Sequence, residues 1–337
     1  MKFGPIAVAK AKGAILAHAY ALPNGRLKKG HQLDDNDINA LITANVRTVI
    51  VAQLDTNDIG ENEAALRVTD GLKELGISVE EPFTGRANLH AMDAGVFFAN
   101  SELIDMINRI SPSVTVATLN DGMFVEAGRL VATVKIIPFA VEREVVEEIE
   151  LLLATKEALT IVPSQPHQIG LIATELPSLK KTTMDKTASV LATRLARAGS
   201  EIVEEIRVAH TSKAVASALT QLKQNCSLII LFGASAITDI NDVIPTALCD
   251  AGGKVDTFGM PVDPGNLLLT GQLGDIPVIG APGCARSPAE NGFDWVLQRI
   301  LAGISVDENY ISGLGVGGLL MEIHSRPQPR SVAKGEA

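Results

Sequence analysis

The residues best suited to chemistry follow a short apolar run in the C-terminal half of the chain. That run, residues 228–232, is too short for a helix and is typical of a strand buried on both faces. Small residues, two carboxylates and a proline follow it in this order: Gly233, Ala234, Ser235, Asp239, Asp242 and Pro245. A buried strand, a small-residue turn and a helix N-terminus form an anion-binding crevice at the carboxyl edge of a parallel sheet. The pattern predicts a ligand site, and a tight strand-to-helix turn without a ligand is the alternative.

The elements that must position these residues alternate between strand and helix after about residue 165. The apolar periodicity predicts strands over residues 169–174, 201–208, 228–232, 255–260 and 277–280, a hairpin around 271–275, and helices over 184–197, 213–224, 242–250 and 288–302. Strand–helix alternation implies a parallel sheet with crossover helices. The expected fold class is therefore α/β, with a C-terminal three-layer α/β/α domain built on a mostly parallel sheet.

The N-terminal half has a different rhythm, in which short strands and turns surround a few helices. Helical spacing is expected over residues 38–45, 61–75, 103–110 and 142–150. This rhythm predicts a mixed, β-rich α+β region at 1–165, of one or two subdomains. A turn-rich segment at 163–167 marks its border with an α/β domain at 166–305. Residues 306–337 are expected to form a C-terminal extension, whose Pro-rich polar tail from Ser325 is typical of a linker.

Polar residues in the N-terminal half offer a second, weaker candidate. Arg86, Asn88 and His90 alternate, so in a strand they share one face. We expect that face to be solvated, and contact with an anionic ligand or a neighbouring subunit is the alternative. His31 lies in a basic turn and is expected to be an exposed turn histidine rather than a ligand.

The composition limits the classes of function. The chain carries 39 acidic and 29 basic residues, and its net charge of −10 argues against non-specific nucleic-acid binding. Apolar runs are shorter than the roughly 20 residues of a membrane helix. Lysines interrupt the apolar N-terminus, so a signal peptide is not expected either. The 3 cysteines are widely spaced and form no CxxC pair, which favours a reducing cytoplasm.

Six stretches of the C-terminal half form an ordered set of motifs: Thr174-Glu175-Leu176, Asp185, Gly233-Ala234-Ser235-Ala236, Asp242-Val243-Ile244-Pro245-Thr246-Ala247, Val262-Asp263-Pro264-Gly265-Asn266 and Gly280-Ala281-Pro282-Gly283. In this order they resemble the molybdenum-cofactor biosynthesis family, the molybdopterin-binding fold of the Mog, MoaB and gephyrin type. Residues 25–31 and 85–89 resemble the leading region of a longer subgroup of that family. With both halves included, the resemblance covers most of the chain.

The resemblance implies that the ligand is molybdopterin, a pterin with a dithiolene and a terminal phosphate. The backbone N–H groups of Gly233 to Ser235 and the Ser235 hydroxyl are then expected to hold the phosphate, helped by the following helix dipole. The other positions that the resemblance assigns to the ligand are Thr174, Ala234, Asp239, Pro264, Gly265, Pro282 and Gly283.

A carboxylate beside a phosphate needs a cation between them. Asp242, with Asp239 or Asp185, is therefore expected to hold Mg²⁺ that bridges ligand phosphates, and Asp242 and Asp185 are the expected catalytic residues. Capping of its own helix is the alternative role of Asp242.

Two classes of function follow from the resemblance. In one, the chain is a transferase that adenylates molybdopterin or inserts molybdate, with a nucleotide as a further ligand. In the other, it is a binding module that presents molybdopterin to a molybdoenzyme, or the binding half of a fusion with a nucleotidyltransferase. Ala234 and Ala236 replace family glycines, and Asn266 and Leu267 replace Lys-Pro, which favours binding over catalysis. The family also implies a homo-oligomer. A nucleotide-binding α/β protein unrelated to molybdenum is a third possibility, which no GxGxxG or Walker pattern supports.

Overall fold

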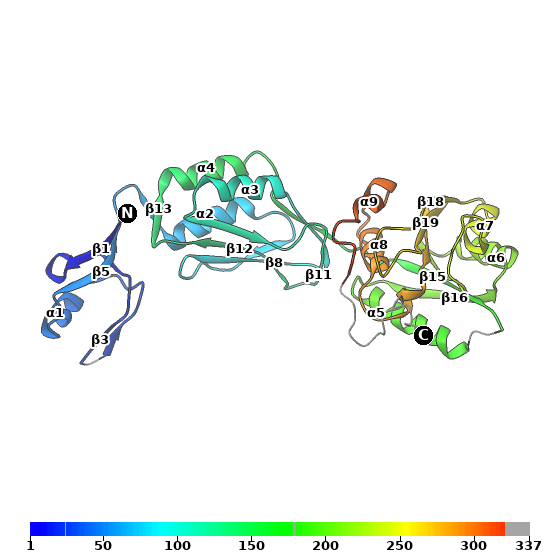
Figure 1. The fold of residues 1–337 in the computed structure, drawn as a ribbon, viewed down its shortest axis with the longest axis horizontal. Helices are drawn as coiled ribbons and strands as arrows, with labels where there is room; N and C mark the ends of the chain where they lie inside the picture. The colour runs from blue at the N-terminus through cyan, green and yellow to red at the C-terminus, as the bar shows by residue number, and fades with distance from the viewer. Residues whose placement is uncertain (24, 178–179, 321–337) are drawn as a thin grey trace, which may run out of the picture. The chain divides into compact units, whose positions relative to one another are not determined.

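The computed structural model describes residues 1–23, 25–177 and 180–320. The chain divides into two compact units, Met1–Pro163 and Ser164–Ala337 (Figure 1). The expected linker-like tail from Ser325 lies outside the described residues. Among the described residues, no helix has the length and apolar character needed to cross a membrane.

The N-terminal unit combines many short strands with a few helices. Its strands are β1 (Lys2–Ala7), β2 (Ile15–Leu16), β3 (Tyr20–Leu22), β4 (Gly25–Leu27), β5 (Thr48–Gln53), β6 (Asp58–Gly60), β7 (Ile77–Val79), β8 (Arg86–Ala91), β9 (Gly95–Ala99), β10 (Val114–Thr118), β11 (Phe124–Val125), β12 (Leu130–Ile136), β13 (Ala140–Glu142) and β14 (Leu159–Pro163). Its helices are the 3-10 turn η1 (Val8–Lys10), α1 (Asp35–Thr43), α2 (Glu61–Leu72), α3 (Ser101–Ile110) and α4 (Arg143–Leu153). All strand pairs described in this unit are antiparallel.

Two separate hydrophobic clusters form in the N-terminal unit. One joins η1, α1 and the sheet β1-β5-β2, and the other packs α2, α3 and α4 against the sheet β10-β12-β8-β7. The predicted alternation in β8 is confirmed, because Ala87, Leu89 and Ala91 are buried while Arg86, Asn88 and His90 are more exposed. This leaves a polar face on β8, opposite the face that carries the core residues.

The C-terminal unit is built on one sheet with the strand order β16-β15-β17-β20-β19-β18. Its strands are β15 (Gln168–Glu175), β16 (Glu201–Ala209), β17 (Leu228–Phe232), β18 (Lys254–Phe258), β19 (Leu269–Leu273) and β20 (Ile276–Ala281). Its helices are α5 (Lys181–Ala196), α6 (Ser212–Leu222), α7 (Val243–Asp250), the 3-10 turn η2 (Gly283–Arg286), α8 (Gly292–Leu301) and α9 (Glu308–Gly313). The pairs β16·β15, β15·β17 and β17·β20 are parallel, whereas β20·β19 and β19·β18 are antiparallel.

Strand β17 shows why the sheet is covered on both faces. Leu228, Ile230 and Phe232 belong to a hydrophobic cluster with α5 and α8, while Ile229 and Leu231 belong to a cluster with α6 and α7. Successive side chains of a strand point to opposite faces, so a run that is apolar at every position requires a helix layer on each side. The expected three-layer α/β fold with a mostly parallel sheet is thus confirmed.

Some predicted boundaries were wrong, and local capping explains the clearest case. The last long helix was expected from residue 288, but α8 begins at Gly292. The Asn291 side chain accepts the Phe293 N–H, and the Asp294 carboxylate accepts the Asn291 N–H in return. This capping box sets the first turn, so Pro288 and the residues after it stay outside the helix.

Candidate functional site

The predicted site lies at the carboxyl edge of the parallel strands, where the connections diverge. After β15 the chain enters α5, which packs on one face of the sheet through Leu191 and Leu195. The helix that follows β17, α7, packs on the other face through Ile244 and Leu248. Adjacent parallel strands whose outgoing connections go to opposite faces leave a crevice outside their carboxyl ends, the usual ligand site of such sheets.

In the loop after β17, the peptide group between Gly233 and Ala234 is hydrogen-bonded on both sides. The Ala234 N–H donates to the Thr174 hydroxyl oxygen at 2.6 Å, and the Gly233 carbonyl accepts from Nη2 of Arg286 at 2.8 Å. These two contacts hold the N–H and the C=O of the Gly233–Ala234 peptide. Its orientation is therefore fixed from both sides.

The sequence explains why this loop runs so close to its neighbours. Register pairs Ala173 of β15 with Phe232 of β17, which brings Thr174 beside Gly233. A Cβ on Gly233 would lie 2.5 Å from the Ser235 carbonyl oxygen, closer than any side chain tolerates. Glycine is thus required here by the tightness of the turn.

Arg286, which the sequence analysis did not select, provides a positive charge beneath the loop. It ends η2, directly after β20, and its Nη1 donates to the Thr187 hydroxyl at 2.8 Å. Its guanidinium also lies 5.2 Å from the centre of the Phe232 ring. Among the described residues it contacts no carboxylate, and burial lowers the pKa of Arg286 below its ordinary value. An arginine stays protonated in proteins, so this is a half-buried cation that no carboxylate of the described residues neutralises.

His210 is a second residue that the sequence analysis missed. It follows β16, and its Nδ1 lies 2.8 Å from the hydroxyl oxygen of the buried Thr174. Thr174 therefore connects His210 to the Ala234 amide. A histidine that follows a predicted strand at this edge of the sheet could have been selected from the sequence as a candidate site residue. The loop that it faces, however, depends on the strand order.

The carboxylates of the loop are engaged by nearby backbone groups. Asp242 is the N-cap of α7, and its two oxygens accept the N–H groups of Val243 at 2.7 Å and Thr238 at 3.2 Å. The Asp239 carboxylate accepts both the backbone and side-chain N–H of Asn241. The capping role considered for Asp242 is present, and its metal role stays a prediction.

Asp185 pairs with a residue of a strand and not with the loop carboxylates. It is exposed on α5 and pairs with Arg207 of β16 at 2.7 Å. No hydrogen bond or ion pair in the described part of the chain joins it to Asp239 or Asp242. Within residues 1–23, 25–177 and 180–320, no group of three or more His, Cys, Asp or Glu side chains is arranged to hold a metal ion.

The remaining predicted residues form two turns. The Pro264 carbonyl accepts the Gly292 N–H at 2.9 Å, and a Cβ on Gly265 would lie 2.9 Å from the Gly292 Cα, so this turn packs against the start of α8. Pro282 caps η2 and Gly283 begins it, which places Arg286 at the end of the same turn. The turn at Pro264 and Gly265 thus packs against the start of α8, and the turn at Pro282 and Gly283 positions the Arg286 guanidinium.

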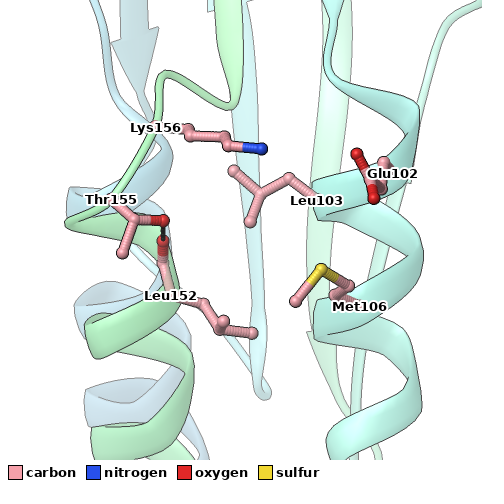
Figure 2. A pocket seen from close by; sticks show the side chains of 6 residues that line it. All are labelled: Glu102, Leu103, Met106, Leu152, Thr155 and Lys156. Carbon is pink, nitrogen blue, oxygen red and sulfur yellow. Dashed lines mark hydrogen bonds between the residues drawn. The ribbon is translucent and has the colours of Figure 1, made fainter.

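A small pocket lies elsewhere, between α3 and α4 of the N-terminal unit (Figure 2). Its lining residues are Glu102, Leu103, Met106, Leu152, Thr155 and Lys156. None of the predicted site residues is among them. Its volume of about 90 Å³ is well below the roughly 300–1,000 Å³ of ligand pockets.

Comparison with known protein families identifies the C-terminal sheet. Residues 168–302 match the molybdenum-cofactor biosynthesis family, described as "Probable molybdopterin binding domain". These residues belong to that family. The resemblance seen in the ordered motifs is thereby confirmed for the molybdopterin-binding domain.

Other comparisons add little beyond this match. Residues 5–53 match a domain of unknown function, DUF8806, and no curated protein sequence matches the chain. A molybdopterin biosynthesis moeA protein from Pyrococcus horikoshii is 12% identical, covering 90% of this chain and 75% of that chain at a TM-score of 0.30. A molybdenum cofactor biosynthesis protein from Pyrococcus furiosus is 17% identical, covering 74% and 71% of the two chains at a TM-score of 0.26. At these TM-scores the likeness carries no argument about fold or function.

Proposed function

We propose that the molybdopterin-binding domain holds molybdopterin, or a derivative of it, during biosynthesis or maturation of the molybdenum cofactor. The ligand's terminal phosphate lies at the loop of Gly233 to Ser235 and at the start of the helix capped by Asp242. The observation that carries this proposal is the half-buried charge of Arg286, which has no carboxylate partner among the described residues.

An anion near the loop would compensate that charge. A guanidinium has five N–H bonds, and hydrogen bonds to Thr187 and Gly233 use two of those of Arg286. Moving a cation out of water costs free energy that a nearby anion recovers, since charges interact more strongly away from bulk water. A phosphate at the crevice would supply the missing counter-charge.

The start of α5 adds to the positive potential at this edge of the sheet. Helix α5 begins at Lys181 with Lys180 as its N-cap, and among the described residues no side chain caps its first turn. A helix N-terminus carries a partial positive charge, which the two lysines reinforce. Both features favour an anionic ligand over a neutral one.

Ser235 is a polar side chain at the start of the loop that remains available to a ligand. It is exposed, and its hydroxyl makes no hydrogen bond within the part of the chain that the structure describes. We assign it to the ligand phosphate as a donor. Mg²⁺ at Asp242, a nucleotide, a homo-oligomer and a partner molybdoenzyme remain further parts of the proposal.

Native purification followed by pterin detection tests the proposal. The full chain is produced in a host that makes molybdopterin, and its ligand is oxidised to a fluorescent pterin and quantified against protein. ATP and CTP turnover are measured on the same sample with added molybdopterin. Bound pterin without turnover indicates a binding module, and turnover indicates a transferase.

A matched pair of serine variants shows whether the signal comes from this loop. Ser235→Ala is expected to weaken pterin binding at least about tenfold and to lower the amount retained accordingly, because a hydrogen bond to a charged group contributes roughly 1.5–3 kcal/mol. Ser189→Ala, an exposed serine on α5, is the control and should match the wild type. If the wild type neither retains pterin nor binds added molybdopterin, the proposed function is wrong.

A further inference from the structure

The Gly233–Ala234 peptide turns its N–H toward the protein and not toward a ligand. The expected phosphate donor, the Ala234 N–H, is used by Thr174, and the carbonyl of the same peptide is used by Arg286. The group that fixes the orientation of the Thr174 hydroxyl therefore decides whether the Ala234 N–H can bind a ligand.

The hydrogen bonds of Thr174 leave one consistent arrangement. A threonine hydroxyl has one O–H donor and two lone pairs, and an amide N–H is always a donor, so the Ala234 contact occupies a lone pair. Thr174 is 0% exposed, and a buried O–H without an acceptor is costly. The acceptor within reach among the described residues is Nδ1 of His210 at 2.8 Å.

This arrangement also determines the tautomer of His210. If Nδ1 accepts the Thr174 O–H, the proton of the neutral ring must be on Nε2. The main chain holds the ring in place, since the His210 N–H donates to the Glu175 carbonyl at 3.0 Å. The contact thus depends on the parallel register of β15 and β16.

Reversing the peptide would strain Ala234. A peptide flip rotates φ of the second residue by about half a turn, and Ala234 now has a negative φ. The flipped form would place an alanine at positive φ, which L-residues other than glycine rarely adopt. The hydrogen bonds to Thr174 and Arg286 would be lost as well.

We propose that His210 is a positioning residue that acts through Thr174 to keep the Ala234 N–H directed inward. A ligand at this edge consequently meets the Ser235 hydroxyl instead of the Ala234 amide. The identity of that ligand rests on the proposed function, whereas the loop orientation does not.

Nuclear magnetic resonance of the full chain, without ligand, tests the positioning role. The ¹⁵N shifts of His210, recorded while its ring is uncharged, are expected to report a proton on Nε2 and an acceptor at Nδ1. Exchange of the Ala234 amide with solvent deuterium is expected to be slow. His210→Phe, which removes the acceptor, should accelerate that exchange about five- to tenfold, the range of one lost hydrogen bond.

Two further variants separate positioning from a merely structural role. His210→Asn places an amide oxygen where Nδ1 lies and should restore the slow exchange of Ala234. His167→Phe is the matched control, because this histidine contacts Ser227 at the opposite end of the same sheet. It should leave Ala234 exchange unchanged.

Each outcome decides the proposal. A proton on Nδ1 of His210 in the wild type overturns it, as does equal Ala234 exchange in the wild type and in His210→Phe. If His210→Phe does not fold, the wild-type tautomer and the His210→Asn exchange still decide. Failure of molybdopterin to bind, with the tautomer and exchange as expected, would refute the proposed function and leave the positioning role standing.

Discussion

Two arginines of the C-terminal unit lie in similar surroundings but differ in what neutralises them. Arg194 of α5 donates from Nε to the Asp294 carboxylate at 2.6 Å, and its other N–H groups reach the carbonyls of Ala285 and Ser287. Within the described part of the chain, Arg286 donates to a carbonyl and a hydroxyl, those of Gly233 and Thr187. Both guanidiniums lie near phenylalanine rings, of Phe293 and Phe232 respectively.

The difference separates a cluster that the fold itself compensates from one that we propose binds the ligand. Asp294 balances Arg194 inside the protein, and the side chains of this pair are 9% and 11% exposed. No carboxylate of the described residues balances Arg286, and its guanidinium contacts the loop that the motifs predict to bind the ligand. A buried charge that the fold leaves uncompensated is a functional candidate, whereas a compensated one is explained by the fold itself.

The largest effect is expected on removing the compensated arginine. Arg194→Met leaves the Asp294 carboxylate buried without its partner, which costs about 3–5 kcal/mol of unfolding free energy. Chemical denaturation of the full chain measures the change. The double variant Arg194→Met with Asp294→Asn, which removes the carboxylate charge but keeps an acceptor for the Asn291 N–H, should recover much of the loss. A double variant as unstable as the single one would contradict the comparison.

Replacing the uncompensated arginine, Arg286, should lower the unfolding free energy less. Arg286→Met removes one donor from Gly233 and one from Thr187 but exposes no unpaired carboxylate, so about 1–2 kcal/mol is expected. The same denaturation experiment measures it. A loss equal to that of Arg194→Met would mean that Arg286 is also a structural residue.

Asp242 tests whether a loop carboxylate does more than cap a helix. Asp242→Ala should cost about 1 kcal/mol, because the N-cap of α7 is lost, while Asp242→Asn keeps a good cap and removes the charge. Molybdopterin binding with and without Mg²⁺ is then measured for both. Binding by Asp242→Asn that keeps the wild-type dependence on Mg²⁺ would exclude the metal role.

The smallest effect concerns His167, a half-buried histidine just before β15. Burial lowers the pKa of His167. At a pH between its folded and unfolded pKa values, the unfolded chain therefore binds a proton at His167 that the folded chain does not bind. Stability is therefore complete above the ordinary histidine pKa of about 6.5 and declines as the pH falls toward the folded value. Unfolding free energies measured between these values should fall less in His167→Asn than in the wild type.

Much of the C-terminal fold could be predicted from the sequence because its signals are local. The run from Leu228 to Phe232 is apolar at every position and is buried at every position. The cap at Asp242 and the small residues before it likewise identify the turn and the start of α7. These features require no knowledge of which strands are neighbours.

The missing part of the site depends on contacts between distant residues. Arg286 and Gly233 are 53 positions apart, and Thr174 and Ala234 are 60 apart. Only the strand order brings these pairs together, and the motifs do not encode it. For the same reason the inward direction of the Ala234 N–H was missed, although the loop itself was selected.

The dissociation constant for molybdopterin of Arg286→Met tests the central claim most directly. Arg109→Met is the control, because this exposed arginine of the N-terminal unit pairs with Asp105 on its own helix. Losing a charged hydrogen-bond donor should weaken binding by Arg286→Met at least about tenfold. The control should bind like the wild type. Equal affinity of a folded Arg286→Met protein and the wild type would contradict the claim that this uncompensated charge holds the ligand's phosphate.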